Sequence, residues 1–192
     1  FQKWYGLKNF NAIEKPYFTP LHAPVCISSK ENYLLADGLI DLKRMRWLGV
    51  MEENRRDHLV EISLQQEHQK PKKLYSSRDF LGYPALNKDA DQLAWIEWEK
   101  PSMPWDANQL CCSSLDKLGR ITSSLILLGS ASATENLVSF FQPIWMKTGQ
   151  LIVAEDKSGW WNLSITRAGV PKANKPVWRS LWPSEAEFGV PQ

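Results

Sequence analysis

The string closest to a catalytic nucleophile is Gly129-Ser-Ala-Ser-Ala133. A serine nucleophile of the elbow type needs Gly-x-Ser-x-Gly, which places the serine on a tight turn between a strand and a helix. Here the closing glycine is missing, and no strand–helix pattern flanks the string. We therefore interpret it as a small-residue loop, and the sequence predicts no catalytic residue in this chain.

The sequence gives no support for a general base or for a set of metal ligands. The three histidines are His22, His58 and His68. We interpret them as a turn, a hairpin and a loop residue, so no Ser-His-Asp triad can be assembled. The chain has no Cys-x-x-Cys, no His-Glu-x-x-His, no calcium-loop spacing and no glycine-rich phosphate loop. The sequence predicts neither a metal site nor a cofactor.

The cysteines indicate reduced thiols. Cys111 and Cys112 are adjacent, and a disulfide between neighbours needs an uncommon, strained geometry. On a strand their side chains point to opposite faces. We expect one thiol in the core and one at the surface, in a cytoplasmic protein.

Charge and hydropathy exclude two classes of partner. The 192 residues carry a formal net charge of +2, too balanced for a nucleic-acid or anionic membrane surface. The longest uninterrupted aliphatic run is 125–128, far too short to span a membrane. All four methionines are internal, so we expect the chain to begin partway through a gene product.

The elements that would position any site are strands. Runs such as Leu93-Ala-Trp-Ile-Glu-Trp98 are apolar on both faces, which is typical of a sheet covered on both sides. Turn signals separate them, and no long stretch has helical periodicity. The sequence therefore predicts an all-β chain, in which the ten tryptophans suit layered sheets, interfaces and ligand sites alike.

A weak repeat favours blades. The hairpin beginning Gly82-Tyr-Pro-Ala-Leu86 matches one beginning Phe141-Gln-Pro-Ile-Trp145, with an earlier copy at 39–41 and a start at 189–191. The repeat length suits a four-stranded propeller blade with variable loops. We predict a partial β-propeller, an open arc of about three to four antiparallel blades, with a chance-repeating β-sandwich as the alternative. The approximate blades are 1–38, 39–81, 82–140 and 141–188, the next being cut off at 189–192.

Four stretches resemble a known family, over about residues 32–192. They are 32–52, then 93–98 followed by Pro101-Ser-Met-Pro-Trp-Asp106, then Ser158-Gly-Trp-Trp-Asn-Leu163, and 185–191. Their order and spacing are similar to propeller blades of prolyl oligopeptidase-family serine peptidases, in the acylaminoacyl- and dipeptidyl-peptidase-like branch. The resemblance implies that a propeller caps an α/β-hydrolase domain and restricts access to its triad. The chain departs from the family's pattern at several positions. The Ser-Pro-Asp-Gly turn of the family is replaced by other residues at 87–92 and 146–150, and its Glu-Asp-His sequence is replaced by Glu53-Asn-Arg55. Cys111 stands where the family has an aromatic residue.

These observations give one main hypothesis and two alternatives. The chain is the non-catalytic gating and docking portion of a peptidase, with the hydrolase domain and a peptide as partners. It could instead be a free-standing scaffold that binds proteins or peptides, or a degenerate remnant of a peptidase gene. Most tryptophans then pack between blades. The possible contacts with substrate or the hydrolase domain are Trp105, Asp106, Trp160, Trp161 and Glu52.

Overall fold

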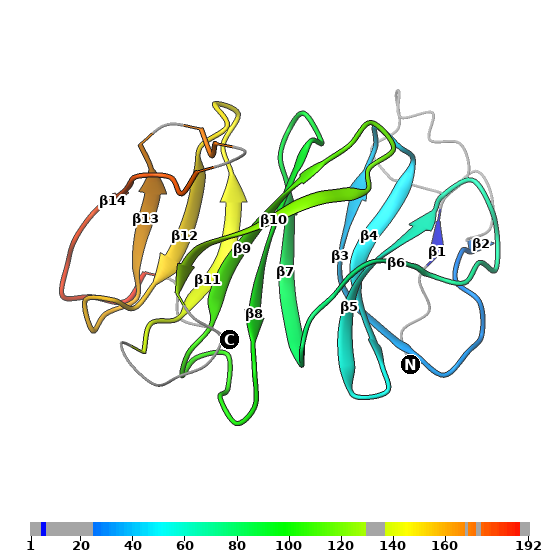
Figure 1. The fold of residues 1–192 in the computed structure, drawn as a ribbon, viewed down its shortest axis with the longest axis horizontal. Coiled ribbons are helices and arrows are strands. Elements are labelled where there is room, and N and C mark those ends of the chain that lie inside the picture. Colours follow the sequence, from blue (N-terminus) through cyan, green and yellow to red (C-terminus); the bar gives the residue numbers. More distant parts are fainter. Residues whose placement is uncertain (1–4, 7–24, 130–136, 168, 172–173, 189–192) are drawn as a thin grey trace, which may run out of the picture.

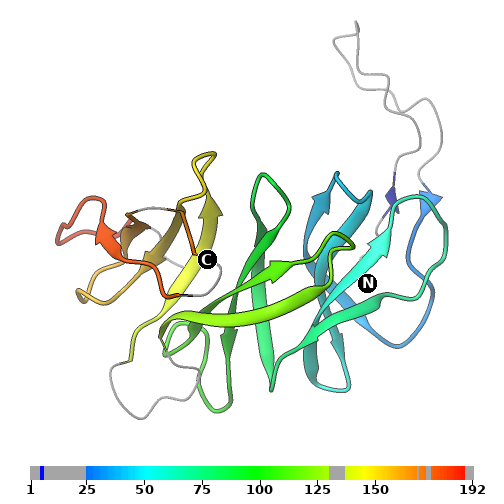
Figure 2. The ribbon, with the colours of Figure 1, turned by 45° about the horizontal axis from the view of Figure 1, so that its top comes forward.

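The computed structural model describes residues 5–6, 25–129, 137–167, 169–171 and 174–188, and these contain strands and no helix. Nothing among them could span a membrane as a helix. Three four-stranded sheets and one two-stranded sheet lie side by side (Figures 1 and 2). The first pair is β1 (Tyr5–Gly6) and β2 (Val25–Cys26). The remaining strands are β3 (Leu34–Asp41), β4 (Arg46–Glu53), β5 (Arg56–Ser63), β6 (Lys72–Ser76), β7 (Phe80–Leu86), β8 (Gln92–Trp98), β9 (Gln109–Leu115), β10 (Ile121–Gly129), β11 (Phe140–Trp145), β12 (Leu151–Glu155), β13 (Asn162–Thr166) and β14 (Trp178–Ser180).

Each four-stranded sheet is an antiparallel meander, with the orders β3-β4-β5-β6, β7-β8-β9-β10 and β11-β12-β13-β14. We call them blades 1, 2 and 3. The first strands are neighbours across blades, since β7 contacts both β3 and β11. This arrangement confirms the predicted all-β partial propeller. The division of the sequence at 38/39, 81/82 and 140/141 stays a prediction, and 189–192 lie outside the described residues.

A β-bulge recurs in the first strand of every blade. The pairing register shifts between Ala36 and Leu39 in β3, and at the corresponding place in β7 and β11. The bulged residues are Asp37, Tyr83 and Gln142, each with φ between 49° and 55°. A bulge leaves one residue outside the ladder, so Pro84 and Pro143 follow it without disrupting a regular pair. The bulge explains why the Gly-Tyr-Pro and Phe-Gln-Pro strings mark equivalent positions.

The core lies between blades. Leu93 and Trp95 of β8 pack toward blade 1, while Ala94 and Ile96 pack toward blade 3. Cys111 and Cys112 likewise face opposite cores, and both are buried at 4% exposure. The expectation of one surface thiol is therefore wrong, because a blade in the middle of an arc is covered on both faces. Burial raises the pKa of both thiols, that of Cys112 to about 12, so neither is a ready nucleophile.

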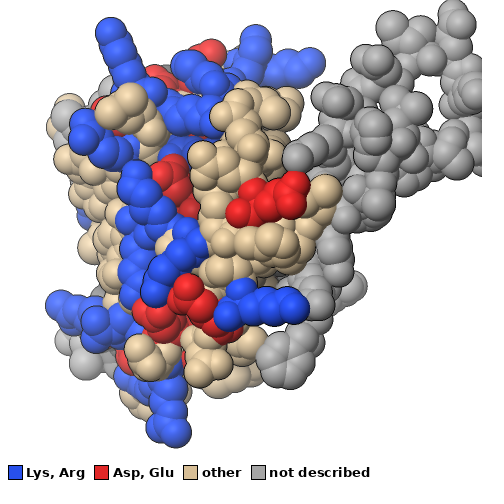
Figure 3. Space-filling model, turned by 90° about the vertical axis from the view of Figure 1, so that its right-hand side faces the viewer, with Lys and Arg blue, Asp and Glu red and all other residues tan. Residues whose placement is uncertain are grey.

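Blade 1 is covered on its outward side by segment 25–33. Ile27 of this segment is 4% exposed and joins a core with Trp47 and Val60. Backbone bonds from Gln69 N to Ile27 O and from Ser29 N to Gln69 O fasten the segment. Lysine–glutamate pairs line the same side, where Figure 3 shows basic and acidic side chains intermixed. The pairs are Lys70–Glu31, Lys72–Glu61 and Lys73–Glu53.

Candidate docking and substrate-access face

The five sequence-predicted site residues lie on one face of the arc. In an antiparallel meander, the connections between second and third strands all emerge at the same edge. Here they are the turn at 54–55, the loop 99–108 and the loop 156–161, which we call the lower face because they lie at the bottom of Figure 1. The structure places Glu52 beside the first, Trp105 and Asp106 in the second, and Trp160 and Trp161 in the third. It brings them to one face but onto three different blades.

Hydrogen bonds hold the loop of blade 2 in one shape. The Asp106 carboxylate accepts the Met103 amide at 2.9 Å, and the Asp106 amide donates to Met103 O at 3.0 Å. Asn108, which is fully buried, donates from its side-chain amide to Pro104 O at 2.7 Å. These bonds leave Met103 47% and Trp105 53% exposed. A large apolar residue held in solvent by a fixed loop is a feature of contact surfaces.

The two tryptophans of blade 3 differ in environment. The Trp161 ring meets Phe141 edge-on at 5.2 Å between centroids, and Phe141 meets Tyr83 of blade 2 in the same way at 5.3 Å. The Trp161 amide donates to Glu187 at 2.7 Å. Trp160 is 40% exposed. Both tryptophans lie in the loop that precedes β13, which begins at Asn162.

Blade 1 presents a polar surface instead. Glu52 accepts the Arg55 amide at 3.2 Å and stands opposite Asp57 across β4 and β5. Desolvation raises the pKa of Asp57, and the negative charges of Glu52 and Asp37 raise it further. Asp37 reaches across to blade 2, where it accepts the Tyr83 amide at 3.0 Å. The lower face thus carries charged side chains of both signs over blade 1 and aromatic side chains over blades 2 and 3.

Sequence reasoning missed Met103, Asn108 and Asp37. Asn108 and Asp37 act through backbone partners that are distant in sequence, so no local motif marks them. A usable signal did exist for Asn108, because it directly precedes the third strand of blade 2 and another asparagine, Asn162, begins the third strand of blade 3. The Asn162 side chain holds the segment that follows blade 3, because it accepts a hydrogen bond from Ser184 N at 2.9 Å.

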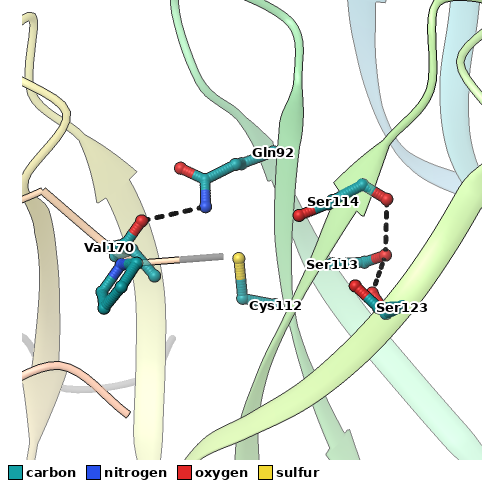
Figure 4. A pocket seen from close by; sticks show the side chains of 7 residues that line it. Gln92, Cys112, Ser113, Ser114, Ser123 and Val170 are labelled. Atoms are coloured by element: carbon teal, nitrogen blue, oxygen red, sulfur yellow. Dashed lines mark hydrogen bonds between the residues drawn. The ribbon is translucent and has the colours of Figure 1, made fainter. Parts of the chain in front are cut away.

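The pocket between blades 2 and 3 does not form a catalytic site. Gln92 donates to Val170 O at 3.1 Å beside the Cys112 thiol (Figure 4). The volume of about 10 Å³ is near the lower limit for one water molecule. Of the small-residue string at 129–133, only Gly129 lies within the described residues. Within those same ranges no group of three His, Cys, Asp or Glu side chains is arranged to hold a metal ion.

His58 is not the hairpin residue that the sequence suggested. It lies within β5 and is 5% exposed, and its Nδ1 is 2.8 Å from Ser76 Oγ of β6. Burial lowers the pKa of this imidazole, and the charge of Lys73 adds to the effect. A buried histidine with a hydroxyl partner in the neighbouring strand is a structural feature of blade 1.

Comparisons with known proteins place this geometry in context. No protein-family model and no curated protein matches the chain. Among solved structures, a puromycin hydrolase is 25% identical, with a TM-score of 0.76 over 88% of this chain and 26% of its own. Two further structures share the fold. A puromycin-hydrolyzing peptidase of Mycobacterium tuberculosis is 21% identical, with a TM-score of 0.72 over 88% of this chain and 27% of its own. Prolyl oligopeptidase B of Galerina marginata is 11% identical, with a TM-score of 0.56 over 78% of this chain and 20% of its own.

The chain therefore spans about a quarter of the length of the puromycin hydrolases that it matches. The match covers most of this chain, and so includes strands from every blade. Strand order, blade arrangement and this likeness together show that the chain is a partial propeller similar to the propeller portion of prolyl oligopeptidase-family peptidases such as the puromycin hydrolases.

Proposed function

We propose that this chain is the non-catalytic propeller portion of a serine peptidase that hydrolyses peptides or acyl-peptides. In this proposal it restricts access to the active site and offers a docking surface to an α/β-hydrolase domain encoded elsewhere in a longer gene product. The observation that supports it best is the match of 88% of this chain to only 26% of a puromycin hydrolase. The reacting serine, histidine and aspartate would then lie in the remaining portion.

The lower face provides the contacts in this proposal. Trp105, Asp106, Trp160 and Trp161 supply apolar surface and hydrogen-bonding groups over blades 2 and 3, while Glu52 lies in the charged sector over blade 1. The Glu52 carboxylate beside an aromatic sector suits a peptide that has a positively charged amine and an apolar side chain. We therefore assign substrate access to the blade 1 sector and domain contact to the aromatic sector.

The proposal includes an acylaminoacyl-peptidase-like parent protein and a cytoplasmic location. The support for this location is the reduced state of the cysteines, since Cys26, Cys111 and Cys112 are all free thiols. In a secreted protein we would expect cysteines to be paired more often.

The test is to express the whole product of the parent gene beside the isolated 192-residue chain. Both are assayed with puromycin, with acyl-peptide and dipeptide chromogenic substrates, and with a serine-directed phosphonate. We expect hydrolysis and one labelled serine in the whole product, outside this chain, and neither in the isolated chain. A whole product that binds peptides but labels no serine would contradict the proposal and favour a free-standing scaffold.

A further inference from the structure

The apolar side chains of the lower face are unevenly distributed among the blades. The connection in blade 1 is a two-residue turn, Asn54-Arg55, flanked by Glu53 and Arg56. The connection in blade 2 exposes Met103 and Trp105, and that in blade 3 exposes Trp160. A partner that buries apolar surface would therefore contact blades 2 and 3 and leave the turn of blade 1 outside the contact.

The blade 2 loop is also the one that is best prepared for contact. Asn108 bonds both to Pro104 O and to the Phe140 backbone, whose amide donates to Asn108 Oδ1 at 2.9 Å. Phe140 begins β11, so one buried amide ties the loop to the first strand of the next blade. A contact residue whose loop is already ordered loses little conformational entropy when it is buried.

From this geometry we infer that Met103 and Trp105 form an anchor that the catalytic portion of the longer protein covers. The inference rests on the proposed function and specifies which side chains carry the docking. The occupant is the rest of the same protein because the similar puromycin hydrolases are more than three times as long as this chain. Because the anchor lies on blade 2, docking protects the lower face of blade 2 and leaves the charged sector around Glu52 and Asp57 on blade 1 open.

The methionines of this chain allow a matched test. Met103 is 47% exposed on the lower face, whereas Met45 at 43% and Met146 at 42% lie in the β3–β4 and β11–β12 connections on the opposite face. Met51 is buried at 2% and serves as the unreactive reference. Peroxide converts exposed methionines to sulfoxides at rates that follow exposure, and mass spectrometry resolves each site.

The experiment compares peroxide oxidation in the whole gene product and in the isolated chain. We expect Met103 to oxidise at least about fivefold more slowly in the whole product, while Met45 and Met146 change less than about twofold. In the whole product, Trp105→Ser should restore rapid oxidation of Met103. Leu118→Ser, at a 68% exposed position in the opposite-face β9–β10 hairpin, should not.

Several outcomes would overturn the anchor. Equal oxidation of Met103 in both proteins would show that nothing covers it, and protection of Met45 in its place would put docking on the opposite face. Concentration-dependent protection in the isolated chain would identify a second copy as the occupant, and protection that appears only with added puromycin would identify substrate. Serine labelling is read separately, so an active enzyme with an unprotected Met103 refutes only the anchor. A protected Met103 in a protein without a labelled serine refutes only the peptidase proposal.

Discussion

Asp57 and Asn108 occupy the same place in successive blades. Each lies at or just before the start of a third strand, and each accepts a backbone amide from the first two residues of the first strand of the next blade. The bonds are Leu81 N to Asp57 Oδ2 at 3.1 Å and Phe140 N to Asn108 Oδ1 at 2.9 Å. Asn162 continues the series by accepting Ser184 N. A side chain near the start of one blade's third strand thus fixes the beginning of the next blade, and of Asp57 and Asn108 only Asp57 is a charged group.

Replacing that charged group should stabilise the chain. Asp57→Asn keeps the acceptor for Leu81 N and removes a carboxylate whose pKa is raised by burial and by Glu52 and Asp37. We expect the free energy of unfolding at pH 7 to rise by up to about 1 kcal/mol, the scale of an unfavourable contact between partly exposed charges. Urea denaturation followed by tryptophan fluorescence measures the change.

The pH dependence of this gain has a definite sign. Because the pKa of Asp57 is raised in the folded state, the folded chain binds this proton more tightly than the unfolded chain. The contribution of Asp57 to stability is therefore greatest in acid and falls as the pH rises through the folded-state pKa. The advantage of Asp57→Asn should appear above that pKa and vanish in strong acid. The reverse variant, Asn108→Asp, should be destabilising at pH 7, because it places a carboxylate at a fully buried position.

The fold was largely predictable because packing between blades imposes a recognisable pattern of apolar residues on each strand. A strand covered on both sides must be apolar on both faces, and β8 shows this without a gap from Leu93 to Ile96. The bulge in each first strand tolerates proline, so Pro84 and Pro143 marked equivalent positions. The cover over blade 1 was not predictable, because Ile27 lies in a segment without strand periodicity and is held by backbone bonds to Gln69.

The two-residue turn of blade 1 gives a second prediction. Asn54 and Arg55 have φ of 56° and 61°, as a type I′ turn requires, and glycine is the preferred residue at the second position. Arg55 is exposed, and the hydrogen bond from its backbone amide to the Glu52 carboxylate does not need the arginine side chain. Arg55→Gly should therefore raise the free energy of unfolding by about 1 kcal/mol, because a left-handed conformation is costly for arginine and not for glycine.

The neighbouring arginine supplies the control. Arg56 is also exposed but begins β5 in extended conformation, where glycine weakens a strand. Arg56→Gly should lower stability by about 0.5–1 kcal/mol. Thermal and urea unfolding of the two variants should move in opposite directions. If both substitutions destabilise the chain, the left-handed backbone conformation of Arg55 does not reduce the stability of this turn.

A third prediction concerns acid sensitivity. The pKa of His58 is lowered in the folded state by burial and by Lys73, so the unfolded chain takes up this proton first as the pH falls. The stability that depends on neutral His58 is present above the ordinary histidine pKa and is lost progressively as the pH falls toward the folded-state value. His58→Gln should flatten the change in urea midpoint between pH 7.5 and pH 5, whereas His68→Gln, at an exposed loop position, should leave it as in the parent chain.

The candidate site was less predictable than the fold. Trp105, Asp106, Trp160 and Trp161 belong to distinctive strings, and the structure puts all four on the lower face. These strings do not reveal the hydrogen bonds between blades that hold the lower face in place. Asn108 reaches Phe140, and Asp37 reaches Tyr83, across 32 and 46 residues of sequence. Such contacts depend on how blades stack, and local spacing carries no signal for them.

Glu97 and Glu99 give the last prediction. They stand two residues apart in sequence, but only Glu97 is buried. It is 6% exposed and accepts hydrogen bonds from Trp95 Nε1 at 2.6 Å and from Gln109 at 3.3 Å. It also helps to raise the pKa of Tyr75, for which burial is the larger cause. Glu99, by contrast, pairs with Arg78, whose side chain is 83% exposed.

The two glutamates should therefore respond very differently to truncation. Glu97→Ala leaves the buried Trp95 N–H without its acceptor and opens a cavity between blades 1 and 2, and we expect a loss of about 2–4 kcal/mol. Glu97→Gln keeps an acceptor oxygen and should lose less. Glu99→Ala removes only a solvated ion pair and should change stability by less than about 1 kcal/mol. Urea unfolding of the three variants decides the matter, since equal losses at both positions would mean that Glu97 is solvated in the folded chain.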